Sequence, residues 1–99
     1  MESLFEYAKQ NQLKLYAGSI SNQICGILMN VNSQYFSEAE KWINKAIEAN
    51  RRIGNIWWLA EDYVLYANLL KRKGDHLDAR KKMSKAIEIY KKCDADGWI

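Results

Sequence analysis

The sequence predicts an all-α protein made of antiparallel helical hairpins, and three observations lead to this fold class. Apolar residues recur every three to four positions along several segments, which places them on one face of a helix. The 99 residues include no proline, and because proline interrupts helices, its absence fits a chain that is helical almost throughout. A shift of 40 residues brings two long segments into correspondence, as expected for a repeated structural unit.

The clearest hairpin extends over residues 60–92, and its turn begins at Gly74. Glycine is suited to the left-handed conformation that ends a helix, and Asp75 is suited to capping the next one. Small residues at Ala67 and Ala79 predict that the two helices cross closely. The apolar faces consist of Tyr63, Tyr66, Ala67 and Leu70 on the first helix, and of Ala79, Met83, Ala86 and Tyr90 on the second.

The 40-residue shift relates this hairpin to an earlier one. It carries residues 85–88, Lys-Ala-Ile-Glu, onto the identical residues 45–48, and it carries Ala79 onto Ala39. Identities clustered in this way within one helix indicate a true repeat rather than a coincidence.

The turn and its two helices resemble a tetratricopeptide repeat (TPR). The resemblance is carried by Gly74 and Asp75 at the turn, by Ala67 on the first helix, and by Ala79 and Ala86 on the second. TPR units have about 34 residues, so a 40-residue period without a closing proline is similar to the long-repeat variant of large bacterial regulators. The resemblance implies a right-handed α-solenoid that serves as a protein-binding scaffold rather than an enzyme.

Together these features predict a single domain of residues 1–99 that begins and ends within a repeat. It would comprise a truncated repeat, two complete repeats and the start of another, at residues 1–16, 17–54, 55–94 and 95–99. The last of these follows from the relation of Trp98 to Trp58 by the same shift. Uncapped repeats expose apolar faces, so self-association through the ends is one expectation and frayed ends are the other.

About five helices are expected in chain order. The first, at residues 3–15, begins with a capping-box spacing between Ser3 and Glu6. The other four form the two complete repeats, at residues 17–32, 35–52, 56–73 and 76–93. A break at Gly54 and Asn55 separates one repeat from the next.

Residue types argue against several classes of function. No apolar run approaches the ~20 residues that cross a bilayer, and the N-terminus lacks the basic and apolar regions of a signal peptide, so a cytoplasmic protein is expected. Cys25 and Cys93 form neither a disulfide framework nor a metal motif. With His76 as the single histidine and no glycine-rich phosphate loop, no catalytic, cofactor-binding or metal-binding residues are predicted.

A partner-binding groove is expected on the first helix of each repeat, which lines the concave side of TPR arrays. The predicted groove residues are Ser21, Ile24, Leu28, Val31, Asn32, Glu61, Val64, Asn68, Lys71 and Arg72. Such a groove would be apolar at one end and basic at the other, which suits an amphipathic helix or a peptide with an acidic end. In the alternative interpretation, Ile24, Leu28 and Val31 pack against neighbouring helices.

The predicted function is therefore a non-enzymatic protein-interaction module, a regulatory arm of a larger bacterial signalling protein. Two rivals stay open. Residues 71–92 carry nine basic and three acidic residues, so the segment could bind nucleic acid, although a basic outer face that serves solubility accounts for the same pattern. The other rival is a purely architectural segment whose only partner is the next repeat.

Overall fold

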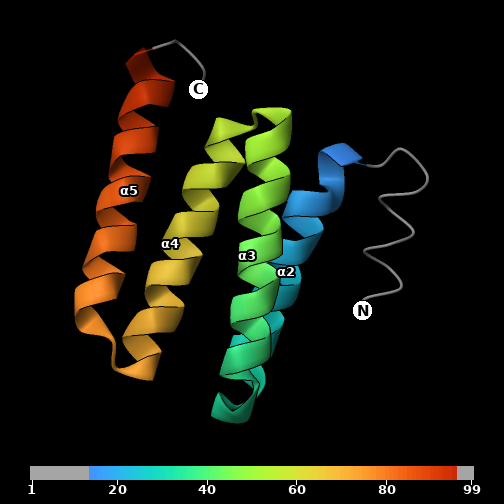
Figure 1. Ribbon diagram of the computed structural model, residues 1–99, viewed down its shortest axis with the longest axis vertical. Helices are drawn as coiled ribbons and strands as arrows, with labels where there is room; N and C mark the ends of the chain where they lie inside the picture. Colours follow the sequence, from blue (N-terminus) through green and yellow to red (C-terminus); the bar gives the residue numbers. More distant parts are fainter. Residues whose placement is uncertain (1–13, 96–99) are drawn as a thin grey trace.

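The computed structural model describes residues 14–95 of the chain, with side chains described for residues 18–93 (Figure 1). These residues form four α-helices, which are α2 (Lys14–Val31), α3 (Phe36–Ile53), α4 (Ile56–Lys73) and α5 (His76–Ala95), and a short 3-10 helix, η1 (Ser33–Tyr35). No strand occurs in this part of the chain. The predicted all-α fold class is confirmed.

The helix boundaries lie close to those expected from the sequence. The bounds of α4 coincide with the prediction, whereas α2 begins at Lys14, ahead of the expected start at residue 17. The described part of the chain contains four α-helices, not five. The expected first helix, at residues 3–15, and the truncated repeat at residues 95–99 lie almost wholly outside the described residues.

Glycines end two of the helices in the way the sequence suggested. Gly54 follows α3 with φ 73°, and Gly74 follows α4 with φ 89°, both in the left-handed region that a side chain disfavours. Asn55 then caps α4 by accepting a hydrogen bond from the Trp58 amide, and Asp75 accepts one from the Asp78 amide at the start of α5. These short turns force consecutive helices to run antiparallel.

The four helices pack as two hairpins, α2 with α3 and α4 with α5, and the hairpins join where α4 lies against both α3 and α2. Figure 1 shows α5, α4 and α3 side by side, with α2 overlapping α3 in this view. Among the described helices, α5 packs only against α4. The arrangement thus repeats a hairpin, and within residues 14–95 no helix packs against the side of α5 that faces away from α4.

Small residues allow close approach within the core. Ala39, Ala46 and Ala86 are fully buried, and Gly18 of α2 sits directly over Asn50 of α3. A Cβ atom on Gly18 would lie 2.2 Å from the Asn50 Oδ1 atom, so only glycine fits there without displacing the Asn50 side chain. The Asn50 amide is thereby held at the point where α2, α3 and α4 meet.

Candidate partner-binding surface

A buried carboxylate links the two hairpins. The Asp62 carboxylate on α4 accepts a hydrogen bond from the Asn22 Nδ2 atom on α2 and another from the Asn50 Nδ2 atom on α3, each at 2.7 Å. Asn22 and Asp62 are 40 residues apart, so equivalent positions of the two repeats contact each other. Burial raises the pKa of Asp62 to about 6, and the two amide hydrogen bonds oppose part of that rise.

Two buried side-chain atoms of the described residues have no hydrogen-bond partner. These are the Oγ atom of Ser21 and the Oδ1 atom of Asn50.

Cys25 is fully buried, and burial together with the charge of Asp62 raises the pKa of its thiol to about 12. A thiol of that pKa stays protonated at neutral pH and is a poor nucleophile, so Cys25 behaves as a small buried apolar residue.

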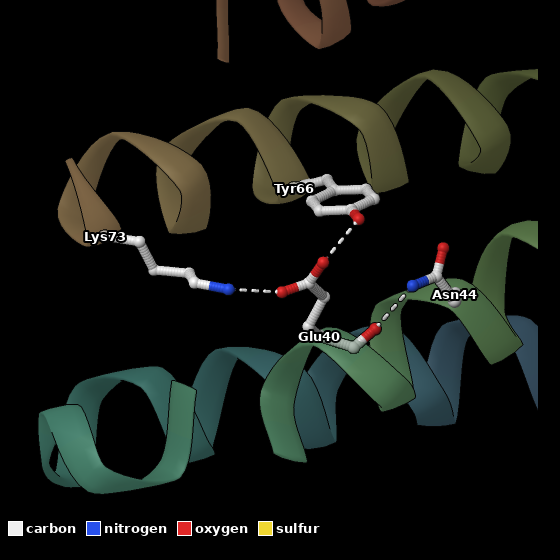
Figure 2. A network of polar contacts seen from close by, with 4 residues as sticks. All are labelled: Glu40, Asn44, Tyr66 and Lys73. Carbon is white, nitrogen blue, oxygen red and sulfur yellow. Dashed lines mark hydrogen bonds and ion pairs between the residues drawn. The ribbon is translucent and has the colours of Figure 1, made fainter. Parts of the chain in front are cut away.

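A second polar network joins α3 to α4 nearer the surface (Figure 2). The Glu40 carboxylate accepts hydrogen bonds from the Tyr66 hydroxyl at 2.8 Å and from the Lys73 Nζ atom at 2.6 Å. The bond from Lys73 lowers the pKa of Glu40, whereas burial and then the bond to Glu40 raise the pKa of Tyr66 to about 12. At physiological pH the charge distribution is therefore a carboxylate held by one cation and one neutral hydroxyl.

Arg72 fastens the end of α4 to the end of α2. Its Nη1 atom donates to the backbone carbonyl of Met29 at 3.0 Å and to the Oδ1 atom of Asn30 at 2.9 Å. The carbonyls of the last helical turn have no partner within their helix, so the guanidinium takes that place. Together with the contacts of Asp62 and Glu40, this bond shows that α4 is seated on both helices of the first hairpin.

The ten residues predicted to line a groove do not share one accessible surface. Ser21, Ile24 and Leu28 are buried. Glu61 and Val64 are half-buried, and Val31, Asn32, Asn68, Lys71 and Arg72 are exposed.

Burial decides between the two interpretations of the apolar residues on α2. Ile24 and Leu28 belong to the core, as the alternative interpretation proposed, so they are not available to a partner. Val31 is 63% exposed and does not pack in this way. Glu61 accepts a hydrogen bond from the Tyr90 hydroxyl, which ties it to the α4–α5 hairpin.

An open groove of about 370 Å³ lies between α4 and α5. It is lined by Ala67, Asn68, Lys71, His76, Ala79, Arg80 and Met83. Asn68 and Lys71 were among the predicted groove residues, but the whole α5 side was missed. The repeat contains a signal that could have found it, because Arg80 lies 40 positions after Glu40, which bonds to α4, and Ala79 and Met83 lie 40 positions after the buried residues Ala39 and Ile43.

The groove combines an apolar floor with a cationic rim. The alanines and Met83 form the floor, and the cations of Lys71 and Arg80 are exposed at its edge, beside the imidazole of His76. None of these three forms an ion pair within 4.0 Å with an acidic residue of the described chain, whereas Lys73 and Lys82 are paired with Glu40 and Asp78. The rim is therefore suited to an anionic group supplied from outside.

Other kinds of site were also sought in residues 14–95. No group of three or more His, Cys, Asp or Glu side chains there could hold a metal ion. None of the described helices has the length and apolar character that crossing a membrane requires.

Comparison with protein-family models, with curated proteins and with solved structures found no match.

Proposed function

We propose that this chain is a TPR-like helical-repeat module that binds other proteins and catalyses no reaction. The observation that carries the proposal is the way α4 is seated on the first hairpin, with Asn22 and Asp62, 40 residues apart, in direct contact. A contact between equivalent positions of successive hairpins is the geometry by which repeat proteins extend into a right-handed solenoid. Such scaffolds serve chiefly to present binding surfaces.

The binding role is supported by the surface of the second hairpin. Its open groove has a floor made by Ala67, Ala79 and Met83 and unpaired cations at its rim. A concave, mainly apolar surface with a few convergent polar groups is the usual form of a binding site. As part of the proposal, the chain acts in the cytoplasm as a regulatory arm of a bacterial signalling protein, and the groove receives a helix or peptide.

Selection of 18-residue peptides displayed on phage, with the purified chain as bait, tests the proposal. The expected result is enrichment of peptides that bind the wild-type chain but not a variant carrying Lys71→Glu, which reverses a charge at the rim. Circular dichroism would establish that the variant is folded, as expected for an exposed residue. Failure to enrich any such peptide would overturn the binding role.

Nucleic-acid binding is the second candidate, and the exposure of Arg80, Lys81, Lys85, Lys91 and Lys92 favours it. A salt titration separates the two functions. Affinity for single-stranded RNA that falls steeply as salt rises, with a slope set by the number of phosphates contacted, would support nucleic-acid binding. A chain that binds neither RNA nor peptides, but whose mass in light scattering rises with concentration, would instead be architectural.

A further inference from the structure

Every residue that lines the open groove has a counterpart 40 positions earlier in the first hairpin. The counterparts are Ile27, Leu28, Val31, Phe36, Ala39, Glu40 and Ile43. Leu28, Ala39 and Ile43 are buried in the core that they share with Tyr66 and Leu69 of α4. The α5 side of the groove therefore corresponds to residues of α3 that are covered, whereas Ile27 and Val31, the counterparts of Ala67 and Lys71, stay exposed on the first hairpin.

The exposed stripe on α5 matches a covered stripe on α3. Arg80, Met83 and Ile87 follow one another along α5, and Ile87 is 48% exposed. Their counterparts are Glu40, which bonds to α4, and the buried residues Ile43 and Ile47. In the first hairpin, this pattern of one charged and two apolar residues over two helical turns receives a helix.

The two places differ in charge. On the first hairpin, Glu40 receives the cation of Lys73 at 2.6 Å. On the second hairpin, the corresponding residue is Arg80, so a helix identical to α4 would set a lysine against an arginine. Lys71 and His76 likewise stand where the first hairpin has Val31 and Phe36. Like charges placed face to face reject a partner, and opposite charges select one.

We infer that the open groove binds an amphipathic α-helix of a partner protein whose acidic residues face Arg80 and Lys71. The helix would lie along α5 as α4 lies along α3, with its apolar side on Met83 and Ile87. This inference rests on the proposed function, because it names the partner of a helical-repeat interaction module.

A helix fits the groove better than RNA does. Single-stranded nucleic acid is held by aromatic side chains on which the bases stack, and none of the residues that line the groove is aromatic apart from the imidazole of His76. An apolar floor also contributes nothing to the recognition of phosphates. The same floor contributes to binding an amphipathic helix, because it removes apolar surface of both partners from water.

A peptide designed from α4 tests the inference directly. The acidic peptide carries the α4 sequence, residues 56–73, with Tyr66→Glu and Lys73→Glu, so that both groups facing Arg80 become carboxylates. The control peptide keeps Tyr66 and Lys73. Both peptides also carry Asp62→Asn, because Asn22 and Asn50, which bind this carboxylate on the first hairpin, correspond to Asp62 and Tyr90 on the second, and these offer it no amide donor.

Binding of each fluorescently labelled peptide to the full chain is measured by anisotropy. The acidic peptide should bind about tenfold or more tightly than the control peptide. An Arg80→Glu variant of the chain should reverse this preference, because it restores the acceptor that Lys73 finds on the first hairpin. A Lys81→Glu variant makes the same charge change at an exposed neighbouring position and should leave the preference unchanged.

Five results would overturn the inference. Equal affinity for the two peptides would show that Arg80 does not select the partner, and an equal effect of Lys81→Glu would show unspecific attraction. Competition by single-stranded RNA that depends on Arg80 would assign the groove to nucleic acid. Dimerisation that Arg80→Glu abolishes would assign it to a second copy. If peptides selected by phage display bind irrespective of Arg80, this inference fails while the proposed function stands.

Discussion

Helices α3 and α5 hold corresponding places in the two hairpins, yet their surroundings differ. α3 packs between α2 and α4, whereas α5 packs only against α4 among the described helices (Figure 1). Ile47 and Ile87 stand within the same four-residue sequence, Lys-Ala-Ile-Glu, but Ile47 is 6% exposed and Ile87 is 48% exposed. Identical local sequence therefore does not decide burial, because burial depends on whether another helix lies opposite.

The charged residues of α3 and α5 differ in the same way, because one is in contact with another helix and the other is exposed. On α3, Glu40 is engaged by Tyr66 and Lys73 from the next hairpin. On α5, Arg80 occupies the equivalent position and is exposed at the edge of a groove. The covered helix has a polar group that matches its neighbour, and the uncovered helix has one that would repel a copy of that neighbour.

The largest expected difference is between Ile47→Ala and Ile87→Ala. Removing the buried side chain at Ile47 should lower the free energy of unfolding by about 3 kcal/mol, because transfer and cavity costs add. The exposed side chain at Ile87 should contribute about 1 kcal/mol or less, partly offset by the better helix propensity of alanine. Urea denaturation followed by circular dichroism measures the free energy of unfolding of both variants. Equal losses would contradict the finding that Ile47 is buried and Ile87 is half exposed.

Asp62 should make stability depend on pH, and its sign can be worked out. The pKa is raised from the ordinary value of 3.8 to about 6, so the folded state holds the proton more tightly than the unfolded state. The contribution is complete below about pH 4 and is lost as the pH rises through about 6, a decline of up to about 3 kcal/mol by pH 7.

The Asp62→Asn variant should lack this decline between pH 4 and pH 7, as measured by thermal unfolding across that range. Glu40 provides the opposite control. Its pKa is lowered, so its contribution is present at neutral pH and is lost only as the pH falls through its folded-state value. A Glu40→Gln variant should therefore keep the decline between pH 4 and pH 7, and a flat profile in the wild-type chain would contradict the buried state of Asp62.

A smaller change in stability is expected when the contact of Glu40 on α3 is removed, and almost none when Arg80, the equivalent residue on α5, is removed. Tyr66→Phe removes the hydroxyl that donates to Glu40 at 2.8 Å and should cost about 1 to 2 kcal/mol of stability. Arg80→Ala removes a side chain that has no ion pair in the described chain and should change stability by no more than about 0.5 kcal/mol. A comparable loss for both variants would show that Arg80 supports the fold rather than a partner.

The smallest change in stability is expected on the outer faces of α3 and α5, where the side chains face solvent and contact no other helix. Arg52 pairs with Glu48 at 2.6 Å, and both side chains are mostly exposed. Arg52→Ala should lower stability by about 0.5 kcal/mol or less, and the loss should vanish in high salt. Lys92→Ala, the equivalent change on α5, should have no measurable effect, and a loss above about 1 kcal/mol at either position would contradict this reasoning.

Much of the fold could be predicted because its signals are local. Gly54 and Gly74 mark helix ends through their own backbone preference, and the three-to-four-residue spacing of apolar side chains reveals each helix. The bounds of α4 were predicted fully for these reasons. The expected start of α2 at residue 17 was too late, because residues 14–16 are already helical and helix ends are poorly determined by sequence.

The candidate site was predicted only in part. Asn68 and Lys71 were identified from the helix face, but Ser21, Ile24 and Leu28 were also included, although they are buried. The network of Asn22, Asn50 and Asp62 and the α5 side of the groove were missed. The network joins positions up to 40 residues apart, so no local pattern of residues contains it. The α5 side of the groove was missed because the prediction considered only the first helix of each repeat.

Local sequence was sufficient to specify the helices, their turns and the pairing of neighbours into hairpins, since each depends on residues within a few positions of one another. The seating of α4 on the first hairpin, the burial of Asp62 and the open groove beside α5 arose only once the helices were assembled. The physical reason is that exposure and charge matching are properties of the space between helices. The same residue type at equivalent positions can pack against another helix in one hairpin and face water in the other.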